Sequence, residues 1–330
     1  MAQSLHFVTL DVFTTAPFTG NPLAVVFLPS SNPNAISQAQ KQLIAREFNY
    51  SETIFVHPVQ PGQTSRTIDI FTVNAELPFA GHPTIGATSW LLRHSKPATD
   101  SHEVPSTITT KAGPIPISVS ATDTNMVSAQ IPHNVHIHSG RLPLGELLKL
   151  HPTAQPYLDP AACADGFPIV SIVKGMTAVH VRLPGLEALA AMTTPSGGYS
   201  LPALSTEKGG FMDPGWDVGM RLVVYFYVKN VEDERTGKSV IRSRMFVETI
   251  EDPATGSAAS GLVAYLALSG EGSGRGKEME FHVVQGVEMG RRSDIGLKVE
   301  MKEGNREIEK IELSGSAVKV AEGDILVRAE

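Results

Sequence analysis

Cysteine is almost absent from this 330-residue chain, which contains Cys163 and no other. A single cysteine cannot form a disulfide within the chain, and it cannot build a zinc site from several thiolates. Any mechanism that needs two thiols in one chain is excluded for the same reason. We interpret Cys163, which lies in a connection rich in Pro, Ala and Asp, as an ordinary half-buried residue.

Excess positive charge and long apolar runs are also lacking. Lys and Arg number 27 against 34 Asp and Glu, and the net charge of -7 with no basic stripe gives no reason to expect nucleic acid. The longest apolar run, Leu222 to Val228, is too short to cross a bilayer, and the first ten residues lack a secretory signal pattern. We therefore predict a cytoplasmic protein with a small-molecule partner and no nucleic-acid or membrane partner.

What the chain does contain is an internal repeat. The segment Glu76 to Leu91, ELPFAGHPTIGATSWL, returns in altered form 175 residues later as Glu251 to Leu266, EDPATGSAASGLVAYL. Six of the 21 positions from Phe71 to Leu91 are identical at this offset, which indicates a duplicated architecture. The alternative is a coincidence between two helix starts that both contain Gly and Pro.

Each copy of the repeat predicts a turn that leads into a helix. Pro83 suits the first turn of one helix, and Thr255 or Ser257 suits the N-cap of the other. The first amides of a helix lack partners within the helix and lie at the positive end of its dipole, so each start can receive an anionic group. Together the two starts predict a two-sided anion clamp.

The remaining pattern predicts more strands than helices, and hence the α+β class. We expect a hairpin from His6 to Leu28, helices over Ala35 to Phe48 and Thr84 to His94, and a left-handed cap at Asn49. The chain length suits two domains of roughly 150 residues each. We place the N-terminal half at residues 1–125, completed by strands at about 315–330, and the C-terminal half at 126–314.

Three residues near the two turns have side chains that can move a proton, namely Glu52, His82 and Asp252. A proton-transfer enzyme needs such a group beside donors that stabilise a carbanion or enolate. Each residue also has an ordinary structural explanation. Glu52 can cap a helix end or pair with Arg46, His82 can be a hydrogen-bonded residue near a helix start, and Asp252 can be a simple cap.

Three further histidines, His133, His136 and His138, lie in the strand-like segment PHNVHIH. A period of two places His136 and His138 on one face of that strand. Because no acidic or thiol ligand follows at a fixed spacing, we predict no metal site there.

Five strings, in the same order and over nearly the whole chain, resemble the phenazine-biosynthesis PhzF-like isomerase family. They are FTTAPFTGNPLAVV, AREFNYSETIFV, FAGHPTIGATSWLL, EDPATGSAASGLVAYL and VVQGVEMGRRS. The resemblance implies a diaminopimelate epimerase-like fold, with two pseudo-symmetric halves, a sheet wrapped around a central helix in each, and an active site in the cleft between them. It also implies a homodimer and a cofactor-independent isomerase that acts on a small carboxylate.

The resemblance also implies roles for individual residues. Glu52 becomes the general acid/base, His82 and Asp252 become its catalytic partners, and the substrate-binding residues become Asn21, Ser51, Gly81, Gly256 and Ser257. Related racemases carry a cysteine where this chain has Ala80 and Thr255, so a single carboxylate has to carry the proton. We expect burial to raise the pKa of Glu52. The alternative is a catalytically idle family member that binds a metabolite or another protein.

Overall fold

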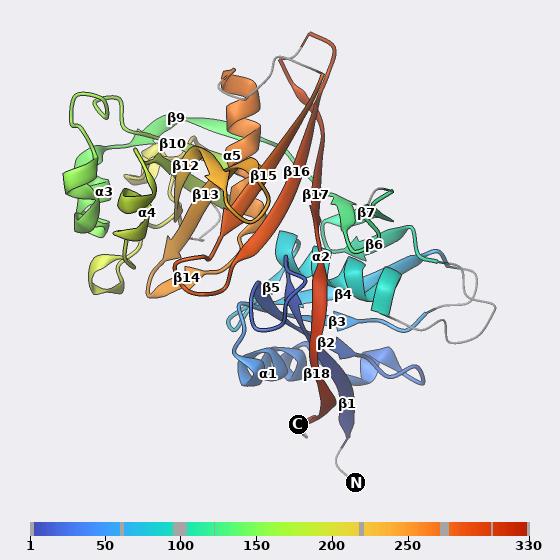
Figure 1. Ribbon diagram of the computed structural model, residues 1–330. Helices are drawn as coiled ribbons and strands as arrows, with labels where there is room; N and C mark the ends of the chain where they lie inside the picture. Colours follow the sequence, from blue (N-terminus) through green and yellow to red (C-terminus); the bar gives the residue numbers. More distant parts are fainter. Residues whose placement is uncertain are drawn as a thin grey trace. The chain divides into compact units, whose positions relative to one another are not determined.

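The computed structural model describes residues 3–59, 63–94, 104–121, 123–217, 221–270, 277–304 and 306–328 (Figure 1). The chain forms two compact units. Unit 1 contains Met1–Ile131 and Glu312–Glu330, and unit 2 contains Pro132–Ile311. The boundary near the C-terminus falls within strand β17, Ile308–Gly315.

Unit 1 is built on a mostly antiparallel arrangement of strands. In order of pairing they are β18 (Ala317–Leu326), β1 (Ser4–Val12), β2 (Asn21–Phe27), β3 (Glu52–Val56), β4 (Ser65–Phe71), β6 (Thr107–Thr110), β7 (Gly113–Val119) and β8 (Val127–Gln130). The pairs β2–β3 and β4–β6 are parallel, and the other pairs are antiparallel. The short strand β5, Glu76–Leu77, adds to β4.

Among the described residues of unit 1, two α-helices accompany these strands. Helix α1, Gln38–Phe48, follows the 3-10 turn Pro33–Ala35 and connects the parallel strands β2 and β3. Helix α2, Gly81–Ser89, continues into the π-helical turn Trp90–His94.

Unit 2 has its own strands in a second mostly antiparallel arrangement. In order of pairing they are β9 (His136–Leu142), β10 (Phe167–Val173), β11 (Met176–Arg182), β12 (Val223–Asp233), β13 (Lys238–Val247), β15 (Glu278–Gln285) and β16 (Ser293–Met301). Here the pairs β11–β12 and β13–β15 are parallel. The short strand β14, Ile250–Asp252, adds to β13.

The helices in the described part of unit 2 lie in three connections. They are α3 (Leu144–Leu150) before β10, α4 (Leu186–Ala190) between β11 and β12, and α5 (Gly256–Ser269) between β14 and β15. Three 3-10 segments accompany them, at Pro152–Tyr157, Ser196–Gly198 and Thr206–Lys208.

The two units repeat one topology. Each shows two antiparallel pairs, a parallel pair, an antiparallel pair with a short added strand, a parallel pair and a further antiparallel pair. The register repeats as well, because Phe71 pairs with Glu76 in unit 1 and Phe246 pairs with Glu251 in unit 2. The predicted duplication and the α+β class are therefore confirmed, since coincidence in sequence does not reproduce a strand order.

The repeated helices are buried within their own units. All nine residues of α2 are buried, and α2 packs against strands β1, β2, β3, β8 and β18. Helix α5 packs against β10, β11, β15 and β16 and buries nine of its 14 residues. The composition fits this burial, because small residues let the strands approach the helix closely. The hydroxyl groups of Thr84, Thr88 and Ser260 are also satisfied, since each donates to the carbonyl four residues before it.

Local predictions were confirmed where capping chemistry determines them. Ser37 and Gln40 form a capping box that starts α1, so the first helix begins at Gln38 rather than at Ala35. Asn49 ends the helix in the left-handed conformation with φ 53°, as predicted. The helix predicted over Thr84 to His94 begins earlier, at Gly81, and its last turn is π-helical.

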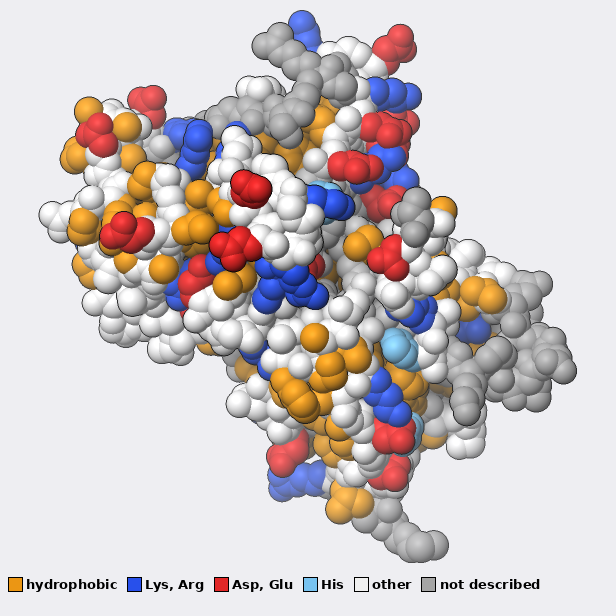
Figure 2. Space-filling model, in the orientation of Figure 1, with side chains coloured by type: hydrophobic (Ala, Val, Ile, Leu, Met, Phe, Trp, Pro, Cys, Tyr) orange, Lys and Arg blue, Asp and Glu red, His pale blue; other side chains and the backbone are white. Residues whose placement is uncertain are grey.

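None of the helices in the described ranges is long and apolar enough to cross a membrane. On the face drawn in Figure 2, Lys and Arg are interspersed with Asp and Glu rather than gathered in a basic stripe.

Each unit also has its own apolar core. Leu142, Phe167, Val181 and Phe226 belong to the core of unit 2, and Leu5, Val26, Phe55 and Phe71 to that of unit 1.

Candidate active site

In unit 1 the structure brings together Glu52 and His82, which lie 30 residues apart in the sequence. Glu52 is the first residue of β3, and His82 is the second residue of α2. The Nδ1 atom of His82 lies 3.0 Å from Oε2 of Glu52. The His82 side chain is 3% exposed and that of Glu52 is 17% exposed, so the pair is largely shielded from water.

The environment of Glu52 corrects one prediction from the sequence. Burial by itself raises the pKa of this carboxyl group, but the hydrogen bond and charge of His82, with a hydrogen bond from Ser51, outweigh burial and lower it. Glu52 is therefore ionised at neutral pH. An ionised carboxylate only accepts hydrogen bonds, so Nδ1 of His82 carries the proton in this contact.

The other nitrogen of His82 has a different environment. Its Nε2 atom is buried and has no hydrogen-bond partner among the described residues. With Nδ1 protonated, Nε2 presents a lone pair in the neutral imidazole and an N–H donor in the imidazolium. In either form this atom can exchange a hydrogen bond or a proton with a bound molecule.

Other predicted residues of unit 1 lie beside this pair. The hydroxyl oxygen of Ser51, which precedes Glu52, also lies 3.4 Å from Oδ1 of the buried Asn21. Gly81 is the first residue of α2, and its N-cap Ala80 has no side-chain group that can cap the helix amides. The alternative pairing of Glu52 with Arg46 is not observed among the described residues, where Nε of Arg46 donates instead to the carbonyl of Val73 at 3.0 Å.

In unit 2 the predicted residues surround the second turn. Asp252 ends β14, and its Oδ2 accepts a short hydrogen bond from the hydroxyl group of Thr255. Thr255 is the N-cap residue of α5, which confirms one of the two predicted options. Its hydroxyl group donates to Asp252 and does not cap the helix amides. Gly256 and Ser257 are the first two residues of α5.

Gln285, the last residue of β15, hydrogen-bonds to this turn, a contact that we did not predict from the sequence. Its Nε2 atom donates to the backbone carbonyl of Asp252 at 2.7 Å and to Oγ1 of Thr255 at 3.0 Å. Its Oε1 accepts from the backbone amide of Thr255 at 3.2 Å. A polar residue at the end of an apolar strand, in the string VVQGVEMGRRS, was the available signal.

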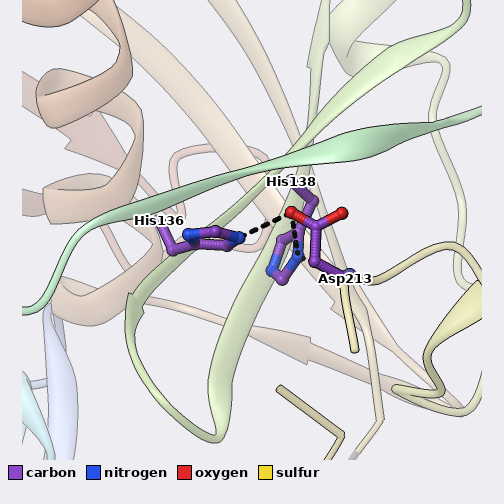
Figure 3. Close-up of side chains that lie close together, drawn as sticks. All are labelled: His136, His138 and Asp213. Atoms are coloured by element: carbon purple, nitrogen blue, oxygen red, sulfur yellow. Dashed lines mark hydrogen bonds and ion pairs between the residues drawn. The ribbon is translucent and has the colours of Figure 1, made fainter. Parts of the chain in front are cut away.

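Within unit 2 a separate polar cluster contains His136, His138 and Asp213 (Figure 3). Both histidines come from strand β9. The acidic residue that the local sequence lacks is Asp213, which lies 75 residues beyond His138 in the chain. Nε2 of His136 lies 2.7 Å from Oδ2 of Asp213. The ligand atoms lie within 4.8 Å of one another, which is compatible with a metal site in distance alone.

The hydrogen bonds indicate a different use of this cluster. Nδ1 of His138 accepts the backbone amide of Asp213 at 3.0 Å, and its Nε2 bonds Oγ of Ser171 at 2.9 Å, so both nitrogens are engaged. Burial, and then the charge of His136, lower the pKa of His138 to about 4, against the opposing effect of Asp213. Trp216 stacks on His136 at 4.4 Å between ring centroids. We interpret the cluster as structural, with hydrogen bonds that hold β9 to the segment that carries Asp213.

The family model for phenazine biosynthesis-like proteins, PhzC-PhzF, matches residues 10–323. The chain belongs to this family. It is 32% identical to a trans-2,3-dihydro-3-hydroxyanthranilate isomerase of Pseudomonas chlororaphis over 98% of this chain and 99% of that protein. It is 29% identical to an uncharacterized isomerase of Mesorhizobium japonicum over 98% and 100% of the two chains.

Solved structures support the same fold. A PhzF-family protein of Bacillus anthracis has a TM-score of 0.70 at 23% identity and covers 98% of this chain and 100% of its own. A hydroxyproline epimerase of Agrobacterium vitis has a TM-score of 0.58 at 12% identity, with coverage of 99% and 94%. The duplicated fold is thus shared with epimerases, and we assign this PhzF-family chain to the isomerases, the class named for its relatives.

Proposed function

We propose that this protein is a cofactor-independent isomerase that moves a proton between two carbons of a small carboxylate substrate. Glu52 is the general acid/base in this proposal. The observation that supports it most directly is the contact between the Glu52 carboxylate and Nδ1 of His82, in a member of an isomerase family. A prototropic shift needs one group that takes a proton and returns it, and no net oxidation or reduction accompanies it.

The proposed chemistry has two steps. The Glu52 carboxylate removes a proton from one substrate carbon, so that the C–H bond breaks, an O–H bond forms and the electron pair delocalises into the adjacent unsaturated system. The protonated Glu52 then returns the proton to a second carbon of that system, which shifts the double bond. The atoms of the substrate and the enzyme balance without a further reactant.

The lowered pKa of Glu52 sets a condition on the substrate. A carboxylate that is ionised at neutral pH is a weak base, so the C–H bond that it attacks has to be acidic and the developing negative charge has to be stabilised. In unit 1, the start of α2 offers backbone amides that no N-cap side chain covers. His82 contacts the carboxylate through Nδ1 and presents Nε2 for a proton relay.

For the substrate we propose a small unsaturated carboxylate. The Pseudomonas relatives are named for trans-2,3-dihydro-3-hydroxyanthranilate, a hydroxylated ring that carries a carboxylate. The start of α5, with Gly256 and Ser257, and the neighbouring Asp252 are proposed to bind and orient it. That these residues and the Glu52 set face one cleft stays a prediction.

We infer further that the protein works as a cytoplasmic homodimer whose partner is the small substrate, without nucleic acid or membrane. Its family membership and the net charge of -7 support this inference. Sedimentation equilibrium should return twice the chain mass of 35.3 kDa, and the mass of a single chain would contradict the dimer.

The experiment for the function is turnover in deuterium oxide. The purified protein, without added cofactor, is incubated with trans-2,3-dihydro-3-hydroxyanthranilate and with a panel of unsaturated carboxylates, and the products are followed by NMR. We expect one product to carry deuterium at a single carbon, in a fraction that reports exchange of the Glu52 proton with water. A dependence on added nicotinamide or metal would contradict the proposal.

A further inference from the structure

The turn that carries Asp252 is fastened from within unit 2 by one buried side chain, that of Gln285. Gln285 is the last residue of β15 and is fully buried. Its amide makes four hydrogen bonds, with the carbonyl of Asp252, the amide and hydroxyl groups of Thr255, and the hydroxyl group of Tyr225. A side-chain amide with two donors and one two-fold acceptor is fully used by these four bonds.

The orientation of this amide follows from its partners. The carbonyl of Asp252 can only accept, so the Gln285 atom 2.7 Å from it has to be the donor Nε2. The backbone amide of Thr255 can only donate, so the atom 3.2 Å from it has to be Oε1. A reversed amide would place donor against donor and acceptor against acceptor, and it would leave buried polar groups without a hydrogen-bond partner.

The orientation of Gln285 then sets the hydrogens along a chain of side chains. Tyr225 donates to Oε1 of Gln285 at 3.0 Å, and so it accepts the hydrogen of Ser243, whose Oγ is 2.8 Å away. Burial raises the pKa of Tyr225 well above its usual range, so this hydroxyl group stays protonated. At the other end, Oγ1 of Thr255 accepts from Nε2 of Gln285 and donates its one hydrogen to Asp252.

Gly286, the next residue, packs against the same turn through its backbone. Its φ of +74° favours glycine, and a Cβ atom there would lie 2.7 Å from the carbonyl oxygen of Pro253. The pair Gln285–Gly286 therefore supports the turn by a side-chain amide at one residue and by close backbone contact at the next.

We propose that Gln285 is a positioning residue of the active site, which acts through Thr255 to set the direction of the Asp252 carboxylate and of the first amides of α5. This inference rests on the proposed function, in which Asp252 contacts the substrate. It does not make Gln285 a catalytic residue, because every contact of its amide lies within the turn and the strands below it.

The direct test is amide hydrogen exchange in the Gln285→Glu variant. Glutamate keeps the size of the side chain but removes both Nε2 hydrogens, so the turn loses its donors. Gln42→Glu is the matched control, because Nε2 of the half-buried Gln42 also donates to a backbone carbonyl, that of Thr72, at 2.8 Å in unit 1. Peptides over residues 250–262 should exchange roughly tenfold faster in Gln285→Glu and unchanged in the control. Unchanged exchange in both variants would overturn the proposal.

Turnover separates positioning from simple stabilisation of the fold. With trans-2,3-dihydro-3-hydroxyanthranilate as substrate, kcat of Gln285→Glu should fall about 10- to 100-fold, the loss expected for a misplaced binding group. In an Asp252→Asn background the same change should cost less than about twofold, since residues that act as a unit are not additive. Losses that multiply across the two backgrounds would contradict action through Asp252.

A second pair of variants covers the case in which Gln285→Glu does not fold. Thr255→Val removes the hydroxyl group that links Gln285 to Asp252, whereas Thr255→Ser keeps it. The Ser variant should exceed the Val variant in kcat by roughly tenfold, and equal values would count against the proposal. Failure of the proposed function would give a different result: Asp252→Asn would keep wild-type turnover, or no carboxylate would turn over. In that case hydrogen exchange still decides whether Gln285 holds the turn.

Discussion

The turns before α2 and α5 share a backbone design but differ in the chemistry that holds them. In both, an acidic residue pairs in register with a phenylalanine on the preceding strand, Glu76 with Phe71 and Glu251 with Phe246. The first turn is held by a backbone bond, from the amide of Ala112 to the carbonyl of Pro78 at 3.1 Å. The second is held by the side chain of Gln285. Duplication therefore preserved the strand pairing and left the side chains to diverge.

Their polar groups diverge in the same way. The helix start of unit 1 presents an ionisable pair, Glu52 and His82, whose Nε2 has no hydrogen-bond partner in the described part of the chain. The turn of unit 2 presents Asp252 on a buried network of neutral groups from Thr255, Gln285 and Tyr225. Under the proposed function, Glu52 and His82 of unit 1 move the proton and the turn of unit 2 orients the substrate.

Substitution of the two acids gives the largest expected effect. Glu52→Gln keeps a hydrogen-bond acceptor for His82 but cannot take a proton, so turnover should drop by roughly 10² to 10⁴ while the fold survives. Asp252→Asn should cost about 10- to 100-fold, since it disturbs orientation rather than proton transfer. Steady-state kinetics beside thermal melts would measure both. Wild-type turnover by Glu52→Gln would remove Glu52 from the mechanism.

The equivalent glycines of the two buried helices should differ in their effect on stability. A Cβ atom at Gly86 would lie 2.3 Å from Cδ2 of Leu23, so Gly86→Ala should destabilise unit 1 by about 1–3 kcal/mol. At Gly261 the nearest atom is Nε2 of His180 at 3.4 Å, and Gly261→Ala should stay within about 1 kcal/mol of the wild type because alanine favours the helix. Urea unfolding gives both values, and equal losses would show that the helices pack alike.

Acid should reduce stability through buried histidines of unit 2. Burial lowers the pKa of His180 to about 3, and neither ring nitrogen has a partner among the described residues. The unfolded state, with a pKa near 6.5, binds the proton more readily, so this contribution is complete above pH 6.5 and is lost as pH falls toward the folded pKa. His180→Leu should therefore flatten the loss of unfolding free energy between pH 7 and 5 by on the order of 2 kcal/mol. Identical pH slopes for variant and wild type would show that His180 is not the sensitive group.

Alkylation of Cys163 should have the smallest effect. Its thiol is half-buried, and burial, with the charge of Asp159, raises its pKa, so it reacts slowly. Because neither turn contains a cysteine, turnover should remain essentially unchanged after treatment with iodoacetamide. Inactivation at Cys163 that the substrate protects against would contradict the carboxylate mechanism.

The sequence by itself determined the features that depend on neighbours along the chain. Chain length and the 175-residue repeat predicted two copies of one strand-and-helix design, and the copies share their strand order and register. Asn49 ended α1 as expected because a left-handed cap is a local conformational preference. His82 and Asp252 were identifiable because they lie within the repeated turns, and Glu52 because it lies in the string AREFNYSETIFV that carries the family resemblance.

Only the tertiary structure decided which polar groups meet. Glu52 and His82 lie 30 residues apart, Asp252 and Gln285 lie 33 apart, and His138 and Asp213 lie 75 apart. No local period encodes such contacts, because they depend on strand order and on how each helix packs. The pKa of Glu52 shows the consequence. Burial alone predicted an increase, but His82 lies close enough to reverse the direction, since a hydrogen bond and an opposite charge at 3.0 Å outweigh the loss of water.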